Sequence, residues 1–399
     1  MLGNIGAMGL YRIISIIVPF LYIPMIINSY GISDYGHFAF ILAVYGVALQ
    51  AAEFGCTMYM VKRIAIGEFS VKDVFVVYKL KLIVYFLFVL PLMYCALMLM
   101  ASYEFIEVFF ISIAVLISCF NLNWWYQGSE YFYLYSFFNL LERLSFLAFI
   151  SSVIIAGFDE KYLILLSPFV GQLILLVTQA FHYVKKHDKN RNNNKALTVR
   201  VLAKGSWGYF YARLSGVIYG QFGVIYLGAL ATNDVVGVYS VLEKLYGAIK
   251  SGVGVVTTIY YPYLARTKDF IGYGRLVFFL FLGLLLLIGL WFIALMGYFE
   301  YYFNIQGLVD DLSYILLGGA MLFAFLSMVV GYPVLGVLGG SDACNKTALS
   351  GLVIYVVSCL VMTIIFNVSV NVVIVSILVS EALTFMLRSI HIWKVIERT

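Results

Sequence analysis

Long apolar segments separated by short polar corners run through almost the whole chain. Each segment has about 20 residues, which is the length of a helix that crosses the hydrocarbon core of a bilayer. The apolar and polar alternation of a transmembrane β-barrel is not visible. The pattern therefore predicts an all-α integral membrane protein with about twelve transmembrane helices. The expected spans are roughly 9–29, 37–57, 79–101, 106–127, 133–156, 162–183, 206–230, 237–259, 276–298, 311–337, 347–367 and 371–392.

The layout of the N-terminal segment returns halfway along the chain. In the first copy Arg12 interrupts an apolar segment, and an acidic corner with Gly36 follows; adding 201 to the numbering leads to Arg213 and Gly237. Overall sequence identity at this offset is close to chance. The evidence for a repeat is therefore positional: in both copies an arginine inside an apolar helix precedes an acidic turn that contains glycine. We predict a duplicated module.

The distribution of Lys and Arg predicts the orientation and the domain organisation. Alternate connections and the C-terminal tail, in which we include Arg388, carry most of the basic residues, whereas the opposite connections hold Lys161 beside a set of acids. The positive-inside bias then places both termini in the cytoplasm. The basic run 185–204 is expected to be a cytoplasmic linker between six-helix bundles at 1–184 and 205–399. Because an even number of spans precedes the linker, the two bundles share one orientation and form a parallel repeat about a pseudo-twofold axis.

Composition agrees with a membrane protein and excludes several other classes. The chain is 63% hydrophobic and only 11% charged, against roughly a quarter charged in soluble domains. The basic linker lacks interleaved aromatic residues, so we expect no nucleic-acid partner. The five cysteines and four histidines show no paired, nucleophilic or metal-ligand spacing, and we expect no disulfide framework, resident metal, cofactor or enzymatic activity. The first apolar segment is interpreted as a retained helix rather than a signal peptide.

Five basic residues nevertheless lie within or at the edges of the spans. Each costs on the order of 2.5–3.5 kcal/mol at the centre of a membrane helix. Helical spacing puts four of them, Arg12, Arg143, Arg213 and Lys250, on narrow polar stripes of helices from both halves. Such stripes favour the walls of a water-filled cavity that binds an anionic substrate over lipid-facing surfaces. The candidate substrate-binding residues are Arg12, Arg143, Arg213, Lys244 and Lys250.

Acidic residues in the same spans offer two other interpretations. Glu142 precedes Arg143 and Glu243 precedes Lys244, so each base could be neutralised locally and only hold helices together. Because neighbouring residues on a helix do not face each other, we expect neither pair to form an ion pair without a third helix. Buried carboxylates can also titrate near neutral pH and couple transport to a proton or a sodium ion. The candidates for coupling are Glu53, Glu142, Glu243 and Glu381.

Residues 121–130 read NLNWWYQGSE. This stretch resembles the Trp-aromatic-aromatic-Gln-Gly corner of Wzx-type O-antigen flippases, which belong to the multidrug/oligosaccharidyl-lipid/polysaccharide (MOP) exporter superfamily. The N-terminal segment is also similar, with Arg12, Pro19 and the Asp-Tyr-Gly corner at 34–36. At 53–55 the chain has Glu-Phe-Gly where relatives commonly carry Asp-x-Gly, which is a mild departure. The specific motifs lie in the first 145 residues, and the second half is similar only in pattern.

The resemblance implies a MATE-like fold and a function. The expected function is movement of an undecaprenyl pyrophosphate-linked O-antigen or related polysaccharide unit from the cytoplasmic to the periplasmic leaflet of the bacterial inner membrane by alternating access. It also implies polysaccharide polymerase and chain-length regulator proteins as partners. Arg143 and Arg12 map best onto the cationic lumen of the family, whereas Arg213 is supported mainly by the internal repeat. A multidrug cation exporter of the same superfamily and a membrane-embedded polysaccharide enzyme are the alternatives.

The aromatic corner itself allows two roles. Aromatic rings can stack on the faces of sugars, and they also form the interfacial belts of membrane proteins. The side chains concerned are Trp124, Trp125, Tyr126 and Gln127.

Overall fold

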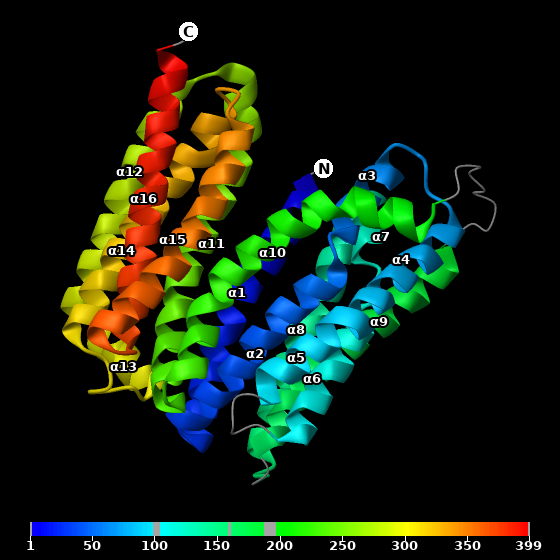
Figure 1. Ribbon diagram of the computed structural model, residues 1–399, viewed down its shortest axis with the longest axis horizontal. Coiled ribbons are helices and arrows are strands. Elements are labelled where there is room, and N and C mark those ends of the chain that lie inside the picture. Colours follow the sequence, from blue (N-terminus) through cyan, green and yellow to red (C-terminus); the bar gives the residue numbers. More distant parts are fainter. Residues whose placement is uncertain (1, 99–103, 159–160, 187–196, 398–399) are drawn as a thin grey trace. The chain divides into compact units, whose positions relative to one another are not determined.

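The computed structural model describes residues 2–98, 104–158, 161–186 and 197–397, and this part of the chain is helical without a β-strand (Figure 1). The first half contains α1 (Leu2–Tyr30), α2 (Ile32–Glu53), α3 (Cys56–Ala65), α4 (Val71–Val84), η1 (Tyr85–Val89), α5 (Leu90–Met98), α6 (Phe105–Ser118), α7 (Asn123–Gly128), α8 (Phe132–Ile155), η2 (Lys161–Leu166) and α9 (Ser167–Lys186). The second half contains α10 (Val199–Leu230), α11 (Asn233–Thr267), α12 (Phe270–Leu290), η3 (Trp291–Leu295), α13 (Met296–Phe303), α14 (Asp311–Val330), η4 (Gly331–Gly336), α15 (Ser341–Phe366) and α16 (Val370–Ile396).

The helices reproduce the expected membrane-spanning architecture. In the described residues, ten helical segments are long and apolar enough to cross a bilayer. They correspond to ten of the twelve expected spans. The two that are missing from this set are the seventh and eighth, which correspond to α10 and α11. These two helices are 32 and 35 residues long, so length does not prevent them from spanning. They carry Arg213, Lys244 and Lys250, which lower their mean hydropathy. The all-α membrane fold is therefore confirmed.

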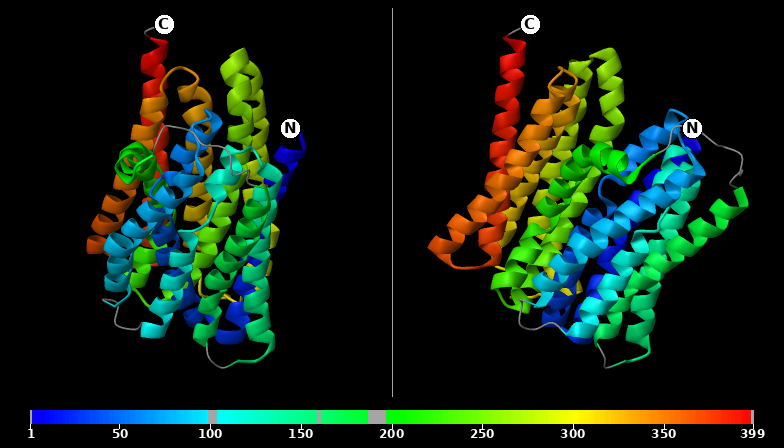
Figure 2. Two further views of the ribbon diagram at one scale, coloured as in Figure 1. Left: turned by 90° about the vertical axis from the view of Figure 1, so that its right-hand side faces the viewer. Right: turned by 45° about the vertical axis from the view of Figure 1, so that its right-hand side comes forward.

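Contacts divide the chain into two compact units, one with Met1–Tyr30 and Phe40–Val217, the other with Gly31–Ala39 and Ile218–Thr399. In each unit the long helices run alongside one another (Figure 2). The expected linker 185–204 is helical at both ends, because α9 continues to Lys186 and α10 begins at Val199. Its central part, 187–196, lies outside the described residues.

The first unit is built around α8, which packs against α1 and α9. The break between α2 and α3 shows how the sequence directs this packing. Phe54 and Gly55 have φ angles of 52° and 68°, a left-handed conformation that favours glycine. A Cβ atom on Gly55 would lie 2.6 Å from the Ser206 carbonyl oxygen of α10. This close approach joins the beginning of α10 to the first unit.

The second unit is built around α14, α15 and α16, with α11 against α14. Arg388 of α16 was expected in the cytoplasmic tail, but it lies within a helical segment, Val370–Val395, that is long and apolar enough to cross a bilayer. Its guanidinium donates to the Ser327 carbonyl oxygen of α14 at 2.6 Å and to the Thr347 hydroxyl of α15 at 3.3 Å. Arg388 therefore connects three helices of the second unit.

Candidate functional site

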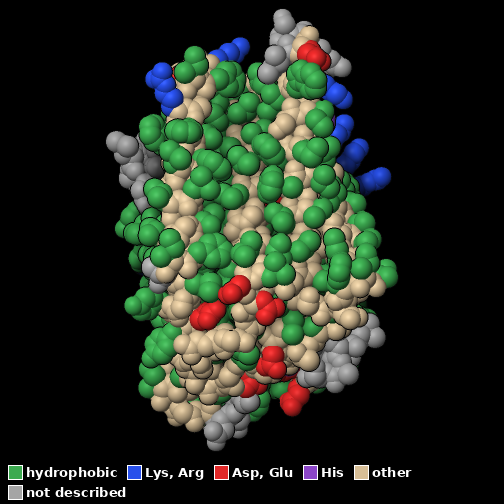
Figure 3. All heavy atoms as spheres, turned by 90° about the vertical axis from the view of Figure 1, so that its left-hand side faces the viewer, with side chains coloured by type: hydrophobic (Ala, Val, Ile, Leu, Met, Phe, Trp, Pro, Cys, Tyr) green, Lys and Arg blue, Asp and Glu red, His purple; other side chains and the backbone are tan. Residues whose placement is uncertain are grey.

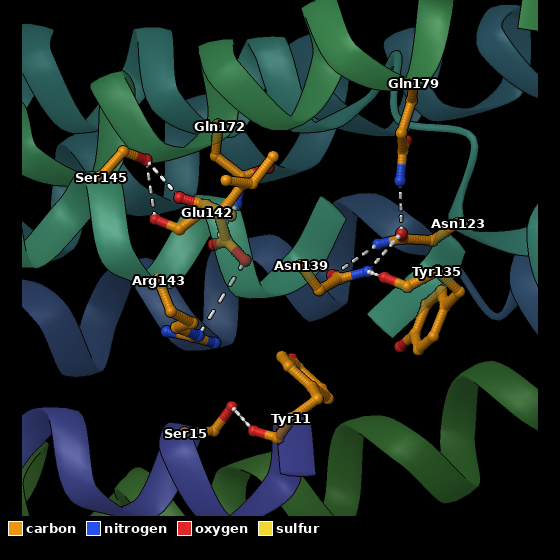
Figure 4. A network of polar contacts seen from close by, with 11 residues as sticks. Tyr11, Ser15, Asn123, Tyr135, Asn139, Glu142, Arg143, Ser145, Gln172 and Gln179 are labelled. Atoms are coloured by element: carbon orange, nitrogen blue, oxygen red, sulfur yellow. Dashed lines mark hydrogen bonds and ion pairs between the residues drawn. The ribbon is translucent and has the colours of Figure 1, made fainter. Parts of the chain in front are cut away.

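Four helices of the first unit contribute to a group of polar residues that we call the N-terminal polar cluster. Its members are Tyr11 of α1, Tyr45 of α2, Glu142 and Arg143 of α8, and Gln172 of α9. Gln172 Nε2 donates to Glu142 Oε1 at 3.0 Å, and Arg143 Nε lies 3.9 Å from Glu142 Oε2 (Figure 4). The Arg143 guanidinium also interacts with the hydroxyls of Tyr11 and Tyr45. The cluster thus draws together side chains that are far apart in the sequence.

Arg143 is surrounded by this cluster and yet remains open. Groups from α1, α2 and α8 interact with it, while 44% of its side chain stays exposed. A distance of 3.9 Å to one carboxylate oxygen is long for a charge-assisted hydrogen bond. Arg143 therefore keeps donors available for an anionic ligand.

Arg213 lies in the same unit and has a similar environment. Its Nη1 atom is 3.9 Å from Glu53 Oε2, and 39% of its side chain is exposed. The Tyr135 hydroxyl of α8 lies close to both Arg213 and Glu142. Through Tyr135, Arg213 borders the N-terminal polar cluster.

Arg12 is exposed, and no hydrogen bond or ion pair to its side chain occurs among the described residues.

Glu53 has a structural role as well as its contact with Arg213. Its carboxylate accepts hydrogen bonds from the backbone N–H groups of Gly55 and Thr57, and Gln50 Nε2 donates to it at 3.1 Å. These contacts satisfy backbone donors at the start of α3, which have no partner inside that helix. Glu53 therefore caps the beginning of α3 at the Glu-Phe-Gly turn.

The second unit contains a compact group that we call the C-terminal polar cluster: Tyr219, Tyr246, Lys250, Ser380 and Glu381. A single oxygen, Glu381 Oε1, accepts from Lys250 Nζ and the Tyr246 hydroxyl at 2.7 Å each. It also accepts from the Tyr219 hydroxyl at 2.9 Å. The Lys250 ammonium lies 4.5 Å from the centre of the Tyr219 ring. Glu381 is only 5% exposed, so its charge is compensated by partners instead of water.

Lys244 and Glu243 contradict the expectation that neighbouring residues do not pair without a third helix. Lys244 Nζ donates to Glu243 Oε2 at 2.6 Å, and the Glu142–Arg143 distance of 3.9 Å also meets the criterion of an ion pair. The expectation was wrong because long side chains can curl along the helix surface, although their Cβ atoms diverge. The local pairing of Lys244 leaves it less available to a substrate than Arg143.

The aromatic corner is part of the core. Trp124 and Tyr126 have no exposed surface and Trp125 is 6% exposed. In this structure these three rings can neither stack on a sugar nor form an interfacial belt, which corrects both interpretations for them. Gln127 differs because it is partly exposed and its side chain reaches the hydroxyl of Tyr135.

An amide network holds the corner in place. Gln179 Nε2 donates to Asn123 Oδ1 at 2.7 Å, and Asn139 Nδ2 donates to the same oxygen at 3.1 Å (Figure 4). Gln179 Oε1 also accepts from the Leu122 N–H at 2.8 Å. The Tyr126 hydroxyl donates to the Gln179 carbonyl oxygen at 2.9 Å. The corner therefore positions α8, which carries Glu142 and Arg143.

Several residues of both clusters were not predicted as site residues from the sequence, namely Tyr11, Tyr45, Gln172, Tyr219, Tyr246 and Ser380. Tyr246 carried one usable signal, since it lies four residues before Lys250 and so on the same helical face.

Within the described residues, no group of three or more His, Cys, Asp or Glu side chains could hold a metal ion.

Comparisons with known proteins agree on the fold. One similar solved structure is an inward-facing multidrug resistance MATE family transporter of the MOP superfamily, with a TM-score of 0.67 and 14% identity, covering 96% of this chain and 94% of that one. Another is the lipid II flippase MurJ in an inward closed conformation, with a TM-score of 0.65 and 12% identity, covering 98% and 87%. The fold is therefore that of the MOP superfamily.

No curated protein sequence matches the chain. A family model described as "Polysaccharide biosynthesis protein" matches residues 1–268. This match covers more than half of the chain and includes both the aromatic corner and the three arginines of the first unit. The chain therefore belongs to the polysaccharide biosynthesis protein family.

Proposed function

We propose that this protein is a flippase that moves an undecaprenyl pyrophosphate-linked O-antigen or related polysaccharide unit from the cytoplasmic to the periplasmic leaflet by alternating access. The observation that carries the proposal is the set of three incompletely neutralised arginines in apolar helices of the first unit. Arg12 has no partner among the described residues, and Arg143 and Arg213 each lie 3.9 Å from one carboxylate. The family match and the solved flippase of the same fold support a lipid-linked saccharide as cargo.

The chemistry of arginine agrees with this cargo. A pyrophosphate carries fixed negative charge, which must be compensated when it leaves water. The planar guanidinium offers paired donors that match phosphate oxygens and is less strongly hydrated than an ammonium group. Arginines that remain exposed within membrane-spanning helices therefore favour a phosphate-containing ligand.

We further propose bacterial inner-membrane localisation with both termini in the cytoplasm. The positive-inside bias supports this orientation. On the face drawn in Figure 3, Lys and Arg side chains gather at one end, most of the acidic side chains lie toward the other, and hydrophobic side chains cover much of the surface between them. Polysaccharide polymerase and chain-length regulator proteins would then act on the delivered units, and we propose them as partners.

Coupling to a proton or a sodium ion is part of the same proposal, and Glu142 is the carboxylate that we propose for it, because it lies beside Arg143, to which we assign cargo binding. Glu142 is partly accessible, with 13% of its side chain exposed, and it contacts both Arg143 and Gln172. Glu381 is less suitable, because its carboxylate is already paired with the Lys250 ammonium, whose Nζ atom lies 2.7 Å from Glu381 Oε1. A coupling cation would have to displace this ammonium.

The proposal is tested by thermal stabilisation of the purified protein. Undecaprenyl pyrophosphate-linked oligosaccharide should raise the unfolding temperature of the parent and of Lys185→Ala, a variant that lacks an exposed cation elsewhere. Arg143→Ala should retain its basal stability and lose most of this ligand-induced shift. Stabilisation by a lipophilic cation instead, unchanged in Arg143→Ala, would favour a multidrug exporter. Turnover of the saccharide into a covalent product would favour a polysaccharide enzyme.

A further inference from the structure

Two apolar hollows adjoin each other in the second unit, between α11, α12 and α14. The larger has a volume of about 500 Å³ and the smaller about 200 Å³. Both are lined by Ile249 of α11 and Leu287 of α12, so they are neighbours, and we call the two together the apolar groove. Its volume falls in the range of small-molecule binding sites.

The groove exists because α12 packs loosely. The only buried side chains described for α12 are those of Tyr273 and Leu284. Two other residues that line the groove, Phe279 and Leu287, are 68% and 58% exposed. The groove is therefore accessible from the bilayer and requires an apolar occupant.

Its length restricts what that occupant can be. On α14 the lining residues extend from Tyr314 to Val329, which is about 22 Å of helix. On α12 and η3 together they extend from Tyr273 to Leu295, which is about 33 Å. The hydrocarbon core is about 30 Å thick, so a phospholipid acyl chain in one leaflet covers about 15 Å. A single chain that occupies the whole length of the groove must therefore be longer than an ordinary acyl chain.

The charge at one end indicates what the chain is attached to. Arg275 of α12 is exposed and precedes Phe279 by one helical turn, so both lie on the same face. Arg275 also lies at the end of α12 that the positive-inside bias places in the cytoplasm. An amphiphile with an anionic head near Arg275 and a long apolar chain would therefore match the groove in charge and in length.

We propose that the apolar groove binds the polyprenyl chain of the cargo while its head lies in the cytoplasmic leaflet. This inference rests on the proposed function, and it assigns the tail of the same lipid-linked substrate to α11, α12 and α14. In a bilayer the chain is already in an apolar medium, so the groove contributes packing contacts and orientation rather than transfer from water.

Two glycines allow a direct test. Gly283 of α12 lines the groove, and a Cβ atom added there meets no atom within 4 Å. Gly283→Phe would therefore introduce a ring at a lining position where the Cβ atom itself meets no protein atom. Gly289 lies in the same helix, is equally free of neighbours within 4 Å, and does not line the groove, so Gly289→Phe is the matched control. Gly252→Leu, on the α11 wall, is a second blocking variant if Gly283→Phe does not fold.

Dissociation constants in nanodiscs would be compared for undecaprenyl phosphate and for farnesyl phosphate, which has the same head and a much shorter chain. Gly283→Phe should weaken binding of undecaprenyl phosphate by about fivefold, because packing contacts along the chain are lost. The loss for farnesyl phosphate should be smaller, because its shorter chain makes fewer contacts along the groove, and Gly289→Phe should behave as the parent for both ligands.

Equal dissociation constants of parent and Gly283→Phe for undecaprenyl phosphate would overturn the groove assignment. An equal loss for phosphatidylglycerol would also overturn it and make the groove a general lipid site. In either case the proposed function stands if pyrophosphate-linked oligosaccharide still stabilises the parent through Arg143. The proposed function fails separately if that stabilisation is absent.

Discussion

Gly36 and Gly237, which occupy equivalent positions of the internal repeat, lie against each other at the beginnings of α2 and α11. A Cβ atom on Gly36 would be 2.8 Å from the backbone nitrogen of Gly237 and 1.9 Å from the carbonyl oxygen of Asn233. A Cβ atom on Gly237 would be 2.5 Å from the carbonyl oxygen of Ile32. Residues near a twofold axis contact their own equivalents, so this contact supports a pseudo-twofold relation between the two copies.

Replacement of Gly36 by alanine is expected to destabilise the protein. The added methyl group meets backbone atoms, which cannot move aside as a flexible side chain would, and overpacking of this kind costs about 1–3 kcal/mol. The measurement is the unfolding temperature in detergent. Gly247→Ala in α11 is the matched control, because a Cβ atom there has no neighbour closer than 3.8 Å. Equal stability of the two variants would contradict the close approach.

Removal of Arg12 should affect the ligand but not the fold. No described residue pairs with its side chain, so Arg12→Ala leaves no carboxylate without a partner, and the free energy of unfolding should change by less than about 0.5 kcal/mol. Affinity for the pyrophosphate-linked cargo should fall by about tenfold, as expected for loss of one charged hydrogen bond. Calorimetry on the purified protein measures the affinity.

Arg63 is the control for Arg12, because its side chain is buried and paired whereas that of Arg12 is exposed and unpaired in the described residues. Arg63 contacts Asp73 at 3.2 Å and Glu68 at 3.4 Å. Arg63→Ala should therefore lower stability by about 3–5 kcal/mol without a specific effect on cargo affinity. If Arg12→Ala instead behaves like Arg63→Ala, Arg12 is a structural residue.

Glu53 should prove to be mainly a helix cap. Glu53→Ala removes the acceptor for the N–H groups of Gly55 and Thr57, and loss of a cap costs about 0.5–2 kcal/mol. Glu53→Gln keeps an acceptor oxygen and should retain more stability and most transport activity in vesicles. Normal stability with abolished transport in Glu53→Gln would show instead that Glu53 couples transport to an ion.

Much of the fold could be predicted from the sequence, because membrane helices are defined by properties local to one segment. A run of about 20 apolar residues must span as a helix, whatever its neighbours are. Arg143 and Arg213 could be singled out for the same reason, since a charge in such a run is costly anywhere in the bundle.

The partners of these charges could not be predicted, because they come from distant helices. Glu381 and Lys250 are 131 positions apart, and helical spacing shows only which face of its own helix each residue occupies. The aromatic corner was misinterpreted for a related reason. Trp124 and Tyr126 have the composition of an interfacial belt, but the amide network of Asn123, Asn139 and Gln179 holds α7 in the core.

The Lys250–Glu381 pair should show strong coupling in a double-mutant cycle. Glu381→Gln and Lys250→Met each leave a partly desolvated partner without its counter-charge, and breaking a buried pair in this way costs about 3–5 kcal/mol. The double variant removes both charges and leaves Tyr219 and Tyr246 to bond the glutamine oxygen. Its loss of stability should therefore be clearly smaller than the sum of the two single losses, as measured by unfolding in detergent. Additive losses would mean that water or another group compensates each charge, and Lys250 would then be available to a ligand in the same way as Arg143.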